Sequence, residues 1–262
     1  MALAEDAPPP WRRLIARLDP RAYLTLHIVV GLLVCLLAGV VFAVLLDSVR
    51  EHDVLVMRDE AVANWFHGNG TAFGDRIFVV VSAIGSPVSM AVLFAIAVLY
   101  LWRAKQRTLL VAWVLSYVGG TVLDGVIKDV VRRPRPEFAA QFLHYSSWSF
   151  PSGHSMGSLI GFAMLAYTVI RIFKVESMPA RVGIWAAAMV IIVLVGYSRI
   201  YLGVHYLSDV AAGYTLGVHR SAFTPTDLPL AIVPHAGAAL AAIPVAPVAD
   251  LLVAITGRAP CR

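Results

Sequence analysis

Charged residues are scarce in this 262-residue sequence: they make up 14% of it, against roughly 25% in an ordinary soluble domain. Apolar residues make up 59%, and the mean hydropathy is +0.77. This balance excludes a disordered chain, a nucleic-acid-binding arm and a typical cytosolic enzyme. It predicts an all-α integral membrane protein, in which lipid is the solvent for most side chains.

Cysteine is also scarce. The two cysteines are Cys35, inside an apolar run, and Cys261, next to the last residue. A disulfide framework needs more cysteines in a shorter secreted chain, so none is predicted. The sequence has no Cys/His pattern with zinc spacing and no P-loop, and we therefore expect neither a metal site nor a cofactor.

Six apolar runs approach the ~20 residues that a spanning helix needs: 22–46, 77–102, 108–127, 152–170, 182–197 and 204–218. The first is too long for a signal peptide and has no cleavage pattern after it, so it is predicted to be an uncleaved helix. The sixth is short and contains Asp209. The expected domains are a basic N-terminus (1–21), a six-helix membrane domain (22–218) and an apolar tail (219–262), whose prolines argue against a seventh spanning helix.

Lysine and arginine in the loops predict the orientation. They gather before the first run, between the second and third runs, and between the fourth and fifth, so both termini are expected on the cytoplasmic side. The link 47–76 carries six acidic and three basic residues and is expected outside. Within it, 54–66 is predicted to be an amphipathic helix on the membrane surface, with Leu55, Val62 and Phe66 as its apolar contacts.

One loop opposes this orientation. The link between the third and fourth runs should lie outside, yet it contains Lys128, Arg132, Arg133 and Arg135. The charge rule is statistical, so the loop is either simply tolerated or retained to bind an anion. We favour the anion, because the planar fork of arginine matches phosphate oxygens and lysine adds a point charge.

Two further polar clusters are predicted at the same membrane face. Ser152 and Gly153 open the fourth run, where free backbone N–H groups and the helix dipole favour an anion. His205 and Asp209 are four residues apart and would share a face of a helix. A carboxylate there can fix the imidazole tautomer and activate the other ring nitrogen as a nucleophile.

Together these clusters resemble the three-part signature of the type 2 phosphatidic acid phosphatase superfamily, over about 73–217. The matching motifs are Lys128-x6-Arg135-Pro136, Pro151-Ser152-Gly153-His154 and Ser198-Arg199-x5-His205-x3-Asp209. The resemblance implies an extracytoplasmic active site in the signature region 128–209. It implies that the phosphate is held by Lys128, Arg135, Ser152, Gly153 and Arg199. His205 would attack phosphorus, Asp209 would orient His205, and His154 would protonate the leaving group and then activate water, without a metal.

Other residues near the motifs have more than one interpretation. Asp124 is expected to pair with Lys128 in a structural role. Ser198 either caps its helix or touches phosphate through its hydroxyl. Arg132 and Arg133 lie between signature positions and are interpreted as surface charges.

The sequence therefore predicts a membrane phosphatase that hydrolyses a lipid phosphate or diphosphate through a phosphohistidine. Undecaprenyl diphosphate is favoured because the site is expected to face outward, and phosphatidic acid, phosphatidylglycerol phosphate and lipid A are kept open. The alternatives are a non-catalytic lipid-phosphate binder or transporter and a vanadate-dependent haloperoxidase. The expected partners are the lipid substrate and the bilayer of a bacterial cell membrane, with no nucleic acid.

Overall fold

The computed structural model describes residues 20–51, 53–138 and 147–222, with side chains between residues 29 and 218 of these ranges. The predicted N-terminal segment and the apolar tail lie outside the described residues, apart from the start of the first helix and the last turn of the final one. The regular elements of the described ranges are all α-helices: α2 (Pro20–Glu51), α3 (Val54–Asn69), α4 (Ala72–Ile84), α5 (Pro87–Arg103), α6 (Arg107–Val131), α7 (Gly153–Ile172), α8 (Met178–Tyr201) and α9 (Leu207–Ala222).

Five helical stretches are long and apolar enough to cross a membrane: Val29–Glu51, Ala72–Arg103, Arg107–Val131, Gly153–Ile172 and Met178–Tyr201. They correspond to the first five predicted runs. The second stretch is interrupted where α4 ends and α5 begins, because Ser86 caps α5 and Pro87 stands in its first turn. The sixth predicted run corresponds to α9, which at about 1.5 Å per residue is shorter than the ~30 Å hydrocarbon core. A sixth crossing therefore stays a prediction.

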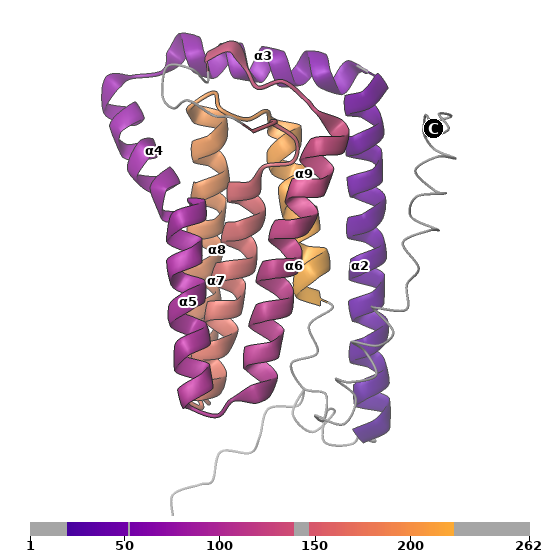
Figure 1. The fold of residues 1–262 in the computed structure, drawn as a ribbon, viewed down its shortest axis with the longest axis vertical. Helices are drawn as coiled ribbons and strands as arrows, with labels where there is room; N and C mark the ends of the chain where they lie inside the picture. Colours follow the sequence, from indigo (N-terminus) through magenta and orange to yellow (C-terminus); the bar gives the residue numbers. More distant parts are fainter. Residues whose placement is uncertain (1–19, 52, 139–146, 223–262) are drawn as a thin grey trace, which may run out of the picture. The chain divides into compact units, whose positions relative to one another are not determined.

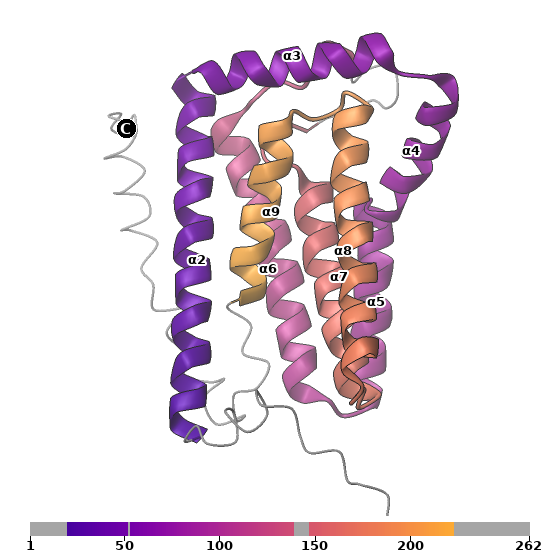
Figure 2. The ribbon, with the colours of Figure 1, turned by 180° about the vertical axis from the view of Figure 1, so that it is seen from behind.

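Helix α7 lies at the centre of the bundle. Of the residues in its most apolar part, 44% are buried inside the protein, whereas the corresponding share in the other four candidate spanning stretches is 11–22%. It packs against α5, α6, α8 and α9, while α2 packs along α9 on the other side (Figures 1 and 2). The outer helices expose large side chains such as Leu36, Leu37 and Val80, as expected for surfaces that face lipid.

Two glycines bring α9 close to α7. A Cβ atom at Gly213 would lie 2.5 Å from the carbonyl oxygen of Ser152, and one at Gly217 would collide with Leu159. Small residues at such positions let two helix backbones approach closely. As a result, the first turns of α7 and α9 lie side by side at one end of the bundle.

Helix α3 crosses this same end and contacts α2, α8 and α9 (Figure 1). The predicted contact residues Leu55, Val62 and Phe66 are half-buried, but the side chains that α3 buries are Asp59 and Ala63. A helix directed only by apolar contacts would not bury an acid, because desolvating a carboxylate is costly unless it is paired. Asp59 therefore has partners beneath α3.

Two chain reversals complete this end. Helix α6 stops at Val131 because Arg132 takes a left-handed conformation, with φ of 50°, and Pro134 cannot continue the helix. After α8, Gly203 has a φ of 60°, a conformation that glycine adopts without strain. The segments that follow these reversals carry the predicted phosphate-site residues.

Candidate active site

The predicted nucleophile, His205, lies in the turn between α8 and α9 and is 2% exposed. Because α9 begins only at Leu207, the prediction that His205 and Asp209 share a helical face is wrong. The two side chains meet nonetheless, with His205 Nδ1 at 3.5 Å from Asp209 Oδ2. The turn folds back because the His205 N–H donates to the carbonyl oxygen of Arg199 at 3.3 Å.

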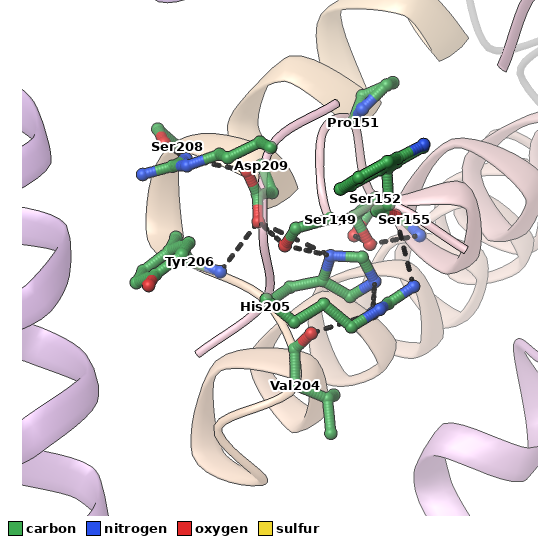
Figure 3. Close-up of polar contacts among 12 residues, drawn as sticks. Ser149, Pro151, Ser152, Ser155, Val204, His205, Tyr206, Ser208 and Asp209 are labelled. Carbon is green, nitrogen blue, oxygen red and sulfur yellow. Dashed lines mark hydrogen bonds and ion pairs between the residues drawn. The ribbon is translucent and has the colours of Figure 1, made fainter. Parts of the chain in front are cut away.

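The neighbours of the His205 ring determine its tautomer. Arg135 Nη1 lies 3.1 Å from Nε2, and a guanidinium can only donate, so Nε2 accepts and the proton of the neutral ring is on Nδ1. Ser149 Oγ lies 3.4 Å from Nδ1 and donates to Asp209 Oδ2 at 2.5 Å (Figure 3). Nδ1–H therefore faces the Ser149 hydroxyl and the Asp209 carboxylate, and the lone pair of Nε2 faces the opposite way.

Arg135 is fixed beside this ring by oxygen acceptors from two segments. Its Nε donates to the carbonyl oxygen of Ser147 at 2.9 Å, and Nη1 donates to that of Val204 at 2.8 Å. Nη2 donates to Ser147 Oγ at 3.1 Å and to the Trp148 carbonyl oxygen at 3.3 Å. The guanidinium plane is therefore oriented before any phosphate arrives.

The other two predicted phosphate-binding cations, unlike the half-buried Arg135, are buried. Arg199 has no exposed surface, and its Nη1 donates to Ser82 Oγ in α4. Lys128 Nζ donates to Asp124 Oδ1 at 2.5 Å and to the Pro151 carbonyl oxygen at 2.7 Å. The expected pairing of Asp124 with Lys128 is present.

The first turn of α7 supplies the third part of the site. Ser152 caps the helix, with its Oγ accepting from the Ser155 N–H at 3.4 Å, while its own N–H donates to the carbonyl oxygen of Asp209 at 3.0 Å. Ser152 thus joins the starts of α7 and α9. The N–H groups of Gly153 and His154, at the first turn of α7, are the ones directed by their position toward an anion.

His154 completes the cluster. It is half-buried and lies within electrostatic reach of Arg199, His205, Arg135 and Lys128. Ser198 is different, because its hydroxyl donates to the Val195 carbonyl oxygen of its own helix at 2.6 Å. Residues from all three motifs therefore gather under α3. Across the described ranges, no group of three or more His, Cys, Asp or Glu side chains is placed to hold a metal ion.

Comparison with known families agrees with this geometry. Residues 109–229 match the profile of the PAP2 superfamily. This matched segment is called the PAP2 domain below. All three motifs lie within this PAP2 domain, whereas α2, α3, α4 and α5 precede it.

Several phosphatases are similar to this chain over part of its length. Phosphatidylglycerophosphatase B of Bacillus subtilis is 42% identical over 97 residues, 37% of this chain and 47% of that protein. An undecaprenyl-diphosphatase of Sulfolobus acidocaldarius is 30% identical over 118 residues, 43% of this chain and 52% of the relative. A lipid A 1-phosphatase of Rhizobium johnstonii is 32% identical over 136 residues, 47% of this chain and 51% of the relative. The chain thus spans about half the length of these curated relatives.

The fold has a counterpart among solved structures. The crystal structure of a transmembrane PAP2 type phosphatidylglycerolphosphate phosphatase from Bacillus subtilis superposes with a TM-score of 0.63 at 27% identity. The match covers 71% of this chain and 92% of that chain, so it extends beyond the PAP2 domain into the helices before it.

The surroundings of His205 in the PAP2 domain keep its ring neutral. Burial lowers the pKa of the imidazole well below its ordinary value of 6.5, and the positive charges of Arg199, Arg135 and Lys128 lower it further. A neutral ring keeps a lone pair on Nε2, which a nucleophile needs and which in this structure accepts from Arg135.

Sequence reasoning missed one part of the site. The interpretation of Arg133 as a surface charge is wrong, since it is buried and binds both Asp59 and Asp209, whereas Arg132 is exposed as expected. The unusual positive charge of the link after α6 was the available signal for Arg133. Asp59 offered none, because it is 74 residues away from Arg133 and lies among other acids of the link 47–76.

Proposed function

We propose that this chain is a membrane phosphatase that removes a phosphate or diphosphate group from a lipid. The observation that carries the proposal is a buried neutral imidazole whose Nδ1–H faces a carboxylate while its Nε2 lies against Arg135. A protein that only binds lipid phosphate needs cations, but it has no use for this ring or for His154 beside it. The PAP2 membership of residues 109–229 supports the same conclusion.

In the proposed first step, His205 Nε2 attacks phosphorus. The N–P bond forms as the P–O bond to the lipid breaks, and protonated His154 gives its proton to the leaving oxygen. Asp209 and the Ser149 hydroxyl stabilise the positive charge on the ring. Fixed cations that meet charge developing on phosphate oxygens usually supply most of the catalysis in phosphoryl transfer.

In the second step, neutral His154 takes a proton from water, and the resulting oxygen attacks phosphorus. The N–P bond breaks, its electron pair returns to His205, and inorganic phosphate leaves. The groups proposed to hold the phosphate throughout are Lys128, Arg135, Arg199, the backbone of Gly153, and Ser152. Acid–base assistance of the His154 kind contributes typically about 10²- to 10⁴-fold in rate.

We propose a bacterial cell membrane as the location. The proposed membrane domain is 22–218, with six crossings, both termini in the cytoplasm and the site on the outer face. Undecaprenyl diphosphate suits an outward-facing site, and the Bacillus subtilis relatives make phosphatidylglycerophosphate an equally direct candidate. A reporter fused after Arg107 that is active outside the cell would contradict this orientation.

The test is phosphate release by the full chain in detergent, from phosphatidylglycerophosphate, phosphatidic acid, undecaprenyl diphosphate and lipid A. We expect turnover that EDTA leaves unchanged, and loss of at least about 10⁴-fold in His205→Ala, because the nucleophile is gone. The matched control is His67→Ala, which removes an exposed imidazole on α3. Full turnover in His205→Ala would refute the assigned nucleophile, and no release from any lipid would refute the phosphatase itself.

A further inference from the structure

Asp59 is the one acid that α3 buries, and it is 1% exposed. Its Oδ1 accepts from the Ser208 N–H at 3.0 Å, while its Oδ2 accepts from Arg133 Nη2 at 2.9 Å and from the Ser208 hydroxyl. A carboxylate buried to this extent is stable only when both oxygens are bound, as they are here. The partners belong to two segments of the PAP2 domain, although Asp59 itself precedes that domain.

Arg133 continues the connection to the nucleophile. Its Nη1 donates to Asp209 Oδ1 at 2.7 Å and to Ser208 Oγ at 2.7 Å, and its guanidinium lies 4.1 Å above the centre of the Tyr206 ring. One arginine is thus shared between two buried carboxylates, Asp59 and Asp209. Because Arg133 occupies Oδ1 of Asp209, the other oxygen, Oδ2, is the one that faces His205.

The start of α9 depends on the same acid. Tyr206 stands at the N-cap position, where its side chain offers no acceptor to the free N–H groups of the first turn. Asp209, at the third helical position, accepts from the Tyr206 N–H at 2.9 Å, which is half of a capping box. Asp59, from α3, accepts from another free N–H of the first turn, that of Ser208.

We propose that Asp59 is a positioning residue for the nucleophile, acting through Arg133 and the first turn of α9. This inference rests on the proposed function. With Asp59 present, two carboxylates share one guanidinium, so the network carries a net negative charge that balances positive charge on the His205 ring. Without the charge of Asp59, Arg133 neutralises Asp209, and that balance is lost.

The test is Asp59→Asn in the full detergent-purified chain. The amide oxygen can still accept from the Ser208 N–H, so the cap of α9 is retained while the charge is removed. We expect kcat to fall by about 10- to 100-fold, as it does when carboxylates that orient metal-bound histidines are removed, with KM unchanged. The matched control is Glu60→Gln, which removes the same charge from the adjacent, exposed position of α3.

A pH profile separates positioning from a merely structural role. The charged or titratable groups that face His205 are Arg199 from α8, Arg135, Lys128 from α6, His154 from α7 and Asp209 from α9. Asp59→Asn leaves all five in place but weakens the negative charge next to Nδ1. We therefore expect the acid limb of the kcat/KM profile to move to lower pH in Asp59→Asn and to stay in place in Glu60→Gln.

Binding of orthovanadate, measured by calorimetry, gives a readout that needs no turnover. We expect weaker vanadate binding in Asp59→Asn than in the wild type. A wild type that binds vanadate but releases no phosphate from lipids would refute the proposed function, and the vanadate affinities would still decide the role of Asp59. Equal kcat and equal vanadate affinity in Asp59→Asn would overturn the inference, and so would a fall in kcat with an unmoved acid limb.

If Asp59→Asn does not fold, Arg133→Lys is the second variant. It keeps the positive charge but cannot bind both carboxylates as a fork, so it is expected to show the same losses of kcat and vanadate affinity.

Discussion

The Ser149 hydroxyl donates the shortest hydrogen bond that the Asp209 carboxylate accepts, at 2.5 Å. The same hydroxyl oxygen lies 3.4 Å from His205 Nδ1. In Ser149→Ala this hydrogen bond to Asp209 is lost. A hydrogen bond to a charged group contributes about 1.5–3 kcal/mol. If that energy is expressed in the transition state, where the ring becomes positive, kcat falls about 10- to 150-fold, since each 1.36 kcal/mol is tenfold.

The Ser149→Ala protein should still fold. Asp209 keeps its bonds to Arg133 and to the Tyr206 N–H, so the carboxylate is not left unpaired. The matched control is Ser158→Ala, which removes another fully buried hydroxyl, one that donates to the Ser155 carbonyl oxygen at 3.0 Å within α7. We expect Ser149→Ala to lose about 1.5–3 kcal/mol of stability and Ser158→Ala about 1 kcal/mol, and only Ser149→Ala to lose turnover.

The measurements are steady-state phosphate release and thermal unfolding in the same detergent. Equal kcat values for the wild type and Ser149→Ala would refute the reasoning, since they would mean that Asp209 acts on His205 across 3.5 Å without the hydroxyl. A parallel loss of kcat in Ser158→Ala would show that the effect comes from general loosening of α7.

Three further predictions can be checked with the same preparations. Arg135→Lys should lower kcat/KM by about 10²- to 10³-fold, because one ammonium cannot replace a fork that is already oriented by carbonyl oxygens; activity near the wild-type level would contradict that role. Gly213→Ala should lower the melting temperature, at a cost of about 1–3 kcal/mol, because its Cβ meets the Ser152 carbonyl oxygen at 2.5 Å, whereas Gly183→Ala, with nothing within 4 Å, should not. The lowered pKa of His205 predicts that its acid limb in kcat/KM lies below pH 6.5. It also predicts that the free energy of unfolding decreases as the pH falls below 6.5, because the unfolded chain then binds a proton that the folded chain does not; His205→Asn should weaken this dependence in thermal unfolding.

Much of the helical organisation could be predicted from composition alone. Five apolar runs correspond to five candidate spanning stretches, and the interruption at Pro87 is visible in the sequence because proline and a serine cap are local signals. That residues of the three motifs gather at one end of the bundle was also predictable, because each motif is short and local in the sequence.

What could not be predicted depends on contacts between distant segments. Asp59 and Arg133 are 74 residues apart, and nothing local distinguishes Asp59 from the other acids of its link. The prediction that His205 lies on a helix was wrong for a related reason. Spacing by four suggests one helical face, but the N–H groups of Val204 and His205 bond to the Arg199 carbonyl oxygen and hold the segment as a turn.

Ser82 and Asp59 both lie before residue 109, where the match to the PAP2 superfamily begins, and yet they bind Arg199 and Arg133 inside it. The domain boundary drawn from sequence similarity is therefore not the boundary of the working unit. In a chimaera that exchanged residues 109–229 for those of a relative, the arginines at these two positions would face helices from a different protein. Their partners Ser82 and Asp59 would then belong to a chain with which the new segment did not evolve. An engineered variant of this chain should therefore keep the helices before residue 109 together with the PAP2 domain.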